Sequence, residues 1–278
     1  MKKILLVFSF LLMFVSVNAQ GFLGKAEYFS KKIQAKKAQK TVTDDKEPLD
    51  PEFEKIFQDA IKKASEKQFL LIFNKTQSLY EEQKYLEKPQ MTDGTSVSIS
   101  YSTAGKKYIN TKEQTSIVED EIFGKEFLIV EPLVQPKWKL INESKKIGEY
   151  NCFKAELIIP VSQKQLEAYE EFLKKEAIKP ALFKMNKPED RIITVWYTPE
   201  IPVSFGPDNY WGLPGLILEV NDGRYLILCS KVTLSNKDIT KIKAPNTGEK
   251  VSQKKFDEIY KKKYDSMKNE DGVIIFQH

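Results

Sequence analysis

The amino-acid sequence predicts an α+β protein: about ten antiparallel strands in one curved sheet or open half-barrel, covered by two or three helices. Runs of β-branched and aromatic residues recur between turn signals from residue 68 to residue 234. The connections between most of these runs are short, and short connections join antiparallel neighbours. Only a few stretches show the three-to-four-residue apolar spacing of a surface helix.

The chain begins with the features of an export signal. Two lysines precede the apolar run Ile4–Val15, and Ala19 is the small residue that a signal peptidase requires. We therefore expect cleavage after Ala19, which gives a signal peptide of residues 1–19 and a single domain of residues 20–278. No later run approaches the length of a membrane-spanning helix. The expected location is the periplasm or the cell exterior, with no transmembrane segment in the mature chain.

The first half of the domain combines one helix with several strands. Residues 25–33 fit either a strand or the start of a helix. A helix is expected from Asp50, an N-cap that is followed by a proline at the first helical position. Beyond it the expected strands are Gln68–Lys75, Ser78–Tyr85, Ser96–Ser102 and Lys107–Asn110, the last two pairing through a turn at Ala104–Lys106.

Two hairpins and a helical insertion follow. The first hairpin pairs Thr115–Ile122 with Lys125–Glu131 around Phe123 and Gly124. The second pairs Trp138–Glu143 with Lys146–Ile159 through Ser144 and Lys145. A capping box, Ser162 with Gln165, opens an insertion over residues 162–180. This helix would form either a lid or surface padding.

The segment Arg191–Val220 organises the centre of the chain. It contains a strand, a loop rich in glycine and proline, and a second strand that begins after the hexapeptide Gly212, Leu213, Pro214, Gly215, Leu216, Ile217. Glycine permits positive φ or close backbone approach, and proline suits the entrance of a strand. We expect the hexapeptide to be a structural joint, with Leu216, Leu218 and Val220 on one face of the strand and Ile217 and Glu219 on the other.

The end of the chain returns to simple patterns. Asn221-Asp222-Gly223 is a tight hairpin signal, and residues 224–234 form the returning strand. Residues 251–267 carry the apolar stripe of a C-terminal helix.

These motifs resemble the GLPGLI family of secreted proteins of Bacteroidetes-type bacteria. The hexapeptide Gly212–Ile217 carries the family's name unchanged, and Trp196–Thr198 and Ile147–Ala155 fit its other segments over about residues 130 to 235. The resemblance implies a secreted protein without an assigned activity. The order of elements is also similar to the incomplete barrels of periplasmic lipoprotein carriers, in which a helix plugs the concave face; that likeness concerns the fold alone.

The residues for common catalytic chemistry are scarce. The only histidine is His278, so a serine or cysteine nucleophile has no evident base and a histidine zinc site is excluded. We therefore predict no catalytic residue, metal site or cofactor. A carboxylate pair could still be assembled in space from five candidates, which are Glu149, Asp190, Glu200, Asp208 and Glu219. The net charge of +5, or +3 without Lys2 and Lys3, and the lack of an arginine-rich groove argue against nucleic acid.

Aromatic residues are the best candidates for binding. Trp138, Trp196, Tyr210 and Trp211 offer large apolar area with one polar atom each, although such rings also fill β-sheet cores. Tyr210 and Trp211 lie in the glycine- and proline-rich loop, where core filling is less automatic.

The two cysteines leave two possibilities open. Cys152 and Cys229 both fall in expected strands, and an exported protein permits a disulfide between them. Two separate buried thiols would satisfy the pattern equally well.

The expected function is therefore a non-enzymatic binding protein of the cell envelope, of the GLPGLI type. Its partner would be an apolar ligand, a lipid, or a segment of an outer-membrane or envelope protein. The alternative is a carboxylate-based hydrolase that acts on envelope material.

Overall fold

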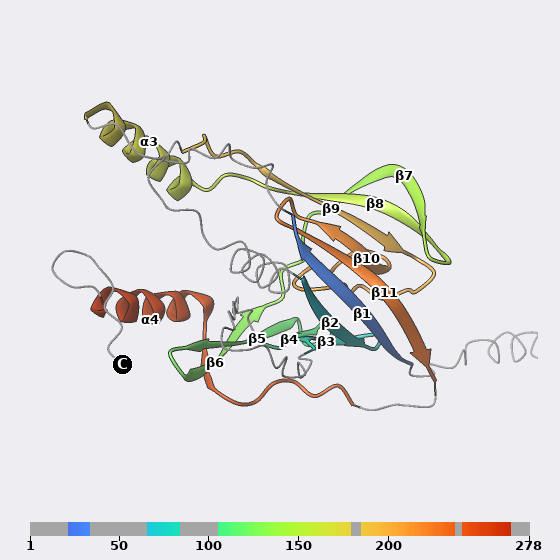
Figure 1. Ribbon diagram of the computed structural model, residues 1–278. Helices are drawn as coiled ribbons and strands as arrows, with labels where there is room; N and C mark the ends of the chain where they lie inside the picture. Colours follow the sequence, from blue (N-terminus) through green and yellow to red (C-terminus); the bar gives the residue numbers. More distant parts are fainter. Residues whose placement is uncertain (1–21, 34–65, 84–104, 179–184, 237–240, 268–278) are drawn as a thin grey trace, which may run out of the picture.

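A computed structural model of the protein describes residues 22–33, 66–83, 105–178, 185–236 and 241–267. Their strands form one open twelve-stranded sheet in the order β12-β6-β5-β4-β3-β2-β1-β11-β10-β9-β8-β7 (Figure 1). All neighbours are antiparallel except β12, which lies parallel to β6. Within these ranges the protein is mostly β, with two helices, so the α+β expectation holds only roughly.

The strands are β1 (Leu23–Lys32), β2 (Glu66–Phe73), β3 (Gln77–Glu82), β4 (Lys107–Asn110), β5 (Thr115–Ile122), β6 (Lys125–Pro132), β7 (Lys139–Ile147), β8 (Tyr150–Ile159), β9 (Arg191–Thr198), β10 (Leu216–Asn221), β11 (Tyr225–Ser235) and β12 (Glu249–Val251). The helices are α3 (Gln163–Ile178) and α4 (Gln253–Ser266).

Several expectations are confirmed and two turns are corrected. The stretch at residues 25–33 fitted either a strand or a helix, and all of it except Ile33 belongs to strand β1. The β5–β6 hairpin turns at Phe123 and Gly124, as expected. The second hairpin turns at Gly148 and not at Ser144-Lys145, because Gly148 adopts the left-handed φ of +57° that suits a tight turn. Ser144 and Lys145 therefore lie inside β7.

The expected pairing of Lys107–Asn110 is also wrong. This stretch is β4, and β3 and β5 pair with all four of its residues on its two sides. Its expected partner Ser96–Ser102 lies outside the described residues. So do the export signal at residues 1–19 and the helix expected from Asp50.

The helix α3 is attached by the predicted capping box. The backbone N–H of Gln165 donates to Ser162 Oγ, and the N–H of Ser162 donates to Gln165 Oε1 at 3.0 Å. Its described side chains are exposed or half-buried, and Figure 1 shows the helix extending away from the sheet. Surface padding therefore describes α3 better than a lid does.

The helix α4 packs against β6, near the edge of the sheet opposite to β7. Ser252 accepts the N–H of Lys255 and caps the helix, close to the expected start of residues 251–267. Phe256 packs edge-on against Phe127 of β6, with ring centroids 5.5 Å apart. One buried aromatic residue thus orients the helix.

The interior of the curved sheet is filled by residues 199–215, which we call the plug loop. Its buried side chains join the main core with residues from β1 to β4 and β8 to β11. Three backbone hydrogen bonds hold its first half against the hexapeptide. The N–H groups of Gly212, Leu216 and Ile217 donate to the backbone oxygens of Ser204, Ile201 and Phe205, respectively. Among the described residues, the plug loop contributes to this core, and neither α3 nor α4 does.

The hexapeptide is the joint that closes the plug loop onto β10. Gly212 adopts a φ of +93°, whereas Gly215 does not have positive φ. A Cβ on Gly215 would lie 2.2 Å from the carbonyl oxygen of Thr198, so glycine is required there by close approach. The expected alternation of faces is wrong, because Ile217 pairs with Tyr197 and Glu219 pairs with the adjacent Trp196, which places Ile217 and Glu219 on opposite faces. Leu216, Ile217, Leu218 and Val220 are all buried. The register of β10 against β9 shifts between Ile217 and Glu219, and the plug loop covers the additional side chains.

We predict that Gly215→Ala destabilises the protein by about 3 kcal/mol or more, because backbone atoms of Thr198 and Pro199 must move to admit the methyl group. Gly148→Ala is the matched control: its φ is positive but nothing lies within 4 Å of the added Cβ. We expect that control to cost about 1 kcal/mol. Urea unfolding followed by circular dichroism measures both losses, and equal losses would show that steric approach at Gly215 is unimportant.

Candidate functional site

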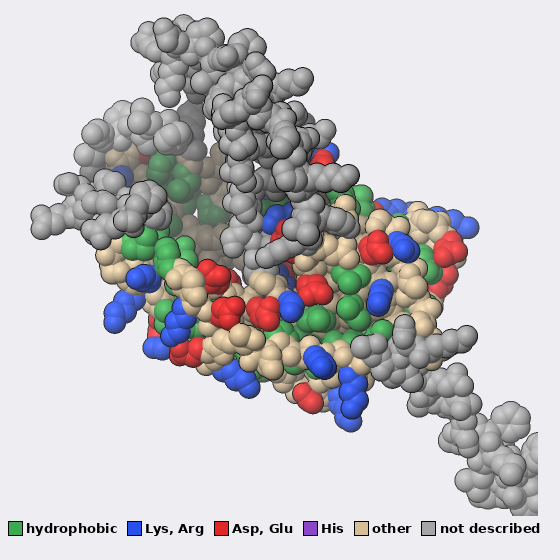
Figure 2. Space-filling view, turned by 60° about the horizontal axis from the view of Figure 1, so that its bottom comes forward, with side chains coloured by type: hydrophobic (Ala, Val, Ile, Leu, Met, Phe, Trp, Pro, Cys, Tyr) green, Lys and Arg blue, Asp and Glu red, His purple; other side chains and the backbone are tan. Residues whose placement is uncertain are grey.

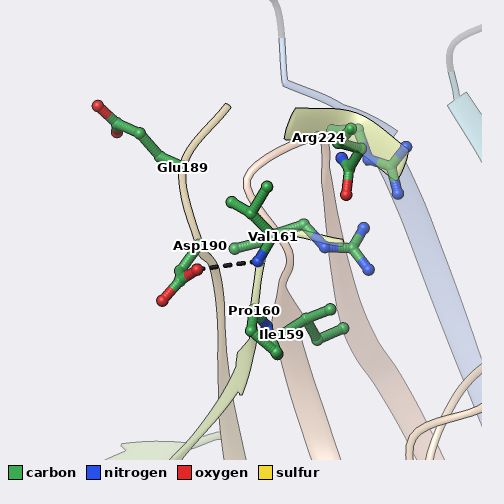
Figure 3. A pocket seen from close by; sticks show the side chains of 8 residues that line it. Ile159, Pro160, Val161, Glu189, Asp190 and Arg224 are labelled. Atoms are coloured by element: carbon green, nitrogen blue, oxygen red, sulfur yellow. Dashed lines mark hydrogen bonds between the residues drawn. The ribbon is translucent and has the colours of Figure 1, made fainter. Parts of the chain in front are cut away.

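An open pocket lies at one end of the curved sheet, where β8 ends, β9 begins and the β10–β11 hairpin turns. We call it the mouth pocket (Figure 3). Its volume is about 540 Å³, and it is lined by Ile159, Pro160, Val161, Gln165, Glu189, Asp190, Arg191 and Arg224. Ile159 and Arg191 are direct partners in the β8–β9 register, which fixes their relative position.

A buried carboxylate holds the two arginines of this pocket in place. Asp222 belongs to the tight turn predicted from Asn221-Asp222-Gly223, in which Gly223 adopts a φ of +82°. Its Oδ1 accepts the backbone N–H groups of Arg224 at 2.8 Å and Tyr225 at 2.6 Å. Its Oδ2 lies 3.7 Å from a guanidinium nitrogen of Arg191 and 4.0 Å from one of Arg224. The turn thus places both guanidinium groups around one negative charge.

The opposite side of the mouth pocket is acidic. Asp190 accepts the backbone N–H of Val161 at 2.9 Å, which joins the start of β9 to the segment after β8. Glu189 is exposed. Figure 3 shows Glu189 and Asp190 on one side of Val161 and Arg224 on the other. An aliphatic wall of Ile159, Pro160 and Val161 therefore separates two sides of opposite charge.

Trp138 and Trp211 support the plug loop, and both pack against or within the main core. Trp211 is only 9% exposed and belongs to the main core. The indole N–H of Trp138 donates to the backbone oxygen of Trp211 at 2.8 Å, and Gln135 donates to the oxygen of Gly212 at 3.3 Å. The structure thus favours the core-filling alternative for Trp211 over a binding role.

Tyr210 lies close to the charged groups of the mouth pocket. Burial raises the pKa of this phenol above its usual value, and the charges of Asp222 and Asp208 raise it further, while Arg191 and Arg224 oppose them. The phenol is therefore a neutral hydrogen-bond donor at physiological pH. An ion pair between Asp208 and Lys107 of β4 fastens this part of the plug loop.

Trp196 occupies a different position. The Lys145 ammonium lies 4.4 Å from the centroid of its ring and forms an ion pair with Glu219 at 2.6 Å. Lys145 of β7 thus reaches Glu219 of β10, although β8 and β9 lie between these strands in the sheet. Such a contact requires a curled sheet. The four aromatic candidates therefore do not line one cavity.

The candidate carboxylates are likewise dispersed, and four of them have separate partners. Besides Asp190, Asp208 and Glu219, Glu200 accepts both the backbone and side-chain N–H groups of Asn151. Among the described residues no three histidine, cysteine or acidic side chains are grouped as a metal site.

The two cysteines are free in the structure, so the possible disulfide is not formed there. Cys152 is fully buried and Cys229 is half-buried, and both contact the main core. Burial raises the pKa of the Cys152 thiol to about 11 and that of Cys229 to about 12. Both groups are therefore neutral thiols at physiological pH.

Sequence reasoning missed Arg191 and Arg224. A signal was present in the composition, because these are the only two arginines among 44 basic residues. The two arginines have 32 residues between them in the chain, so the sequence does not show that they lie close together. The β9–β10–β11 arrangement brings them to the same end of the sheet.

The fold and the mouth pocket define a β-sheet protein with a plugged interior and a polar, two-sided pocket at its rim. Residues 138–219 match the model of a family, Porph_ging, described as a protein of unknown function. This range covers β7 to β9, the plug loop and much of β10. No helix within the described ranges is long and apolar enough to span a membrane.

Comparison with solved structures gave distant matches. Structures of PNGF-II in the C2 and P21 space groups share 14% identity with this chain, with TM-scores of 0.47 and 0.46. The alignments cover 87% of this chain but only 33% and 34% of those chains, so this chain spans about a third of their length. A comparison with curated proteins found no match.

We predict that Trp211→Ala lowers the unfolding free energy by roughly 3–5 kcal/mol, because it empties a buried site in the main core. Trp138→Phe keeps a ring but removes the bond to the Trp211 carbonyl oxygen, and should cost only about 1 kcal/mol. Denaturant unfolding of both variants provides the test. A near-neutral Trp211→Ala would return this residue to the list of binding candidates.

We also predict that both thiols react slowly in the folded protein at pH 8 and react fully in denaturant, giving two thiols per chain. Unfolded thiols ionise near pH 8.5. The pKa values of both thiols are higher in the folded protein. Their contribution to the free energy of unfolding is therefore fully present below about pH 8.5 and is lost as the pH rises toward 11. The double Cys→Ala variant should therefore show a shallower loss of stability above pH 9; an unchanged slope would contradict the assignment.

Proposed function

We propose that this chain is an exported, non-enzymatic binding protein of the cell envelope, of the GLPGLI type, which holds a ligand or a partner segment at the mouth pocket. The single observation that supports this most directly is the pocket itself, open at the rim and bounded by residues from three separate parts of the chain. Export by cleavage after Ala19 is part of the proposal and rests on the sequence pattern.

The packing of the interior favours binding at the rim. In the plug loop Ile201, Val203 and Phe205 are at most 3% exposed. These side chains occupy the space that an enclosed lipid chain or other apolar ligand would need. The aliphatic wall of the mouth pocket can still receive the apolar part of a ligand or of an envelope protein segment.

The arrangement of carboxylates supports a binding role over the hydrolase alternative. Hydrolysis by two carboxyl groups needs both to face one substrate at a separation of about 5–10 Å. Asp208, Glu219 and Glu200 each bind a separate structural partner at a different place. Among the described residues that line the mouth pocket, the carboxylates are Glu189 and Asp190, which are adjacent in the chain, and Asp190 already accepts the backbone N–H of Val161. No serine, threonine, cysteine, lysine or histidine is among these described lining residues.

We predict that a photo-crosslinking amino acid in place of Glu189 captures a specific adduct in cells of the native host. Glu189 lines the mouth pocket and is exposed, so its replacement disturbs no buried contact. The same amino acid at Lys254, an exposed position on α4, is the control. Mass spectrometry of the adducts identifies the ligand or protein; the same adducts at both positions would refute binding at the mouth pocket.

A further inference from the structure

We infer that the mouth pocket contains an oxyanion subsite, in which Arg191 and Arg224 together bind a carboxylate or phosphate group of the ligand. This inference names the ligand class of the proposed function and rests on that function for its location. It assigns a task to two residues whose position is otherwise unexplained.

The first argument is the distribution of arginine. The chain uses lysine for 42 of its 44 basic residues and arginine for two, and both arginines line this pocket. Over the face in Figure 2, basic and acidic side chains are interspersed, as on an ordinary solvated surface. Arginine differs from lysine in its planar fork of five donors, which matches a carboxylate or a phosphate with two parallel hydrogen bonds.

The second argument is that the guanidinium groups share one counter-charge and keep their donors. Asp222 lies 3.7 and 4.0 Å from them, beyond the length of a hydrogen bond. One negative charge faces two positive ones, and its other oxygen is engaged by backbone N–H groups. Neither guanidinium forms a hydrogen bond with a described residue, and their side chains are 36% and 67% exposed. The pair therefore lies around one carboxylate and is accessible.

The acidic side of the pocket limits what the rest of the ligand can be. Glu189 and Asp190 lie across the aliphatic wall from Arg224 (Figure 3). Their charges repel a second anionic group and favour an amine or a hydroxyl at that end. We therefore expect a ligand with one oxyanion and a neutral or cationic remainder, and weak binding of polyanions.

The scarcity of arginine makes a direct test possible by NMR. The isotope-labelled protein should show two arginine Nε–Hε signals, which Arg191→Lys and Arg224→Lys assign by removing one each. We expect inorganic phosphate, and separately acetate, to shift both signals with one common saturation curve at constant ionic strength. Each Arg→Lys variant should weaken phosphate binding about tenfold, because lysine lacks the fork geometry. Unchanged melting temperatures would show that the variants remain folded.

A variant that is expected to strengthen phosphate binding distinguishes an oxyanion subsite from a purely structural arginine pair. Glu189→Gln removes a negative charge from the pocket and should tighten phosphate binding severalfold. Lys254→Gln, far from the pocket on α4, should leave the curve unchanged. Signals that follow only ionic strength, or a curve insensitive to Glu189→Gln, would overturn the inference. If the adduct at position 189 persists in that case, the binding function stands and only its ligand class is wrong.

Vesicles identify the source of the oxyanion. If the group belongs to a lipid, the protein should sediment with vesicles that contain phosphatidylglycerol and not with phosphatidylcholine alone, and Arg191→Gln with Arg224→Gln should abolish sedimentation. Phosphate or acetate binding without sedimentation would assign the subsite to a soluble ligand. Failure of all three probes would overturn the inference.

Discussion

Burial of the plug loop against the curved sheet is the constraint on which the rest of the structure depends. An irregular segment inside a core must satisfy its own backbone polar groups, since each unpaired group costs about 1–3 kcal/mol. The bonds from Leu216 to Ile201 and from Ile217 to Phe205 meet part of this requirement by using the edge of β10. The hydroxyl of Tyr28 donates to the Ile217 oxygen at 2.7 Å and so connects β1 to the same point. Gly215 makes the closure sterically possible, because only a residue without Cβ fits against Thr198.

The same loop explains how a site at the rim can be rigid. Its tip is fastened to β4 by the Lys107–Asp208 ion pair and to the residue before β7 by the bond from Trp138 to the Trp211 oxygen. Tyr210 lies between these attachments and is held near the charged residues of the mouth pocket. Trp138 and Trp211, which resembled binding groups, therefore act mainly as supports of the plug loop.

The electrostatics of the mouth pocket follow from one turn. Asp222 is 8% exposed, and a buried carboxylate is tolerated only when hydrogen bonds and opposite charges compensate its desolvation. Two backbone N–H groups and two guanidinium groups provide that compensation. Because the guanidinium contacts are long, compensation of Asp222 leaves the arginine donors available to a ligand.

The sequence by itself determined the elements whose signals are local. The β5–β6 hairpin, the Asn221-Asp222-Gly223 turn, the Ser162 capping box and the C-terminal helix each depend on a few adjacent residues, and the structure contains all of them. The two glycines of the hexapeptide differ in their reason. Gly212 adopts a positive φ, whereas Gly215 is required because its backbone lies against Thr198 at the end of β9. Tertiary structure alone decided that Trp211 is core and that Arg191 meets Arg224. It also decided that Trp196 lies beneath Lys145. These outcomes depend on strand order and sheet curvature, which arise from contacts between segments far apart in the chain, and no local periodicity specifies which distant side chains will share one end of a sheet.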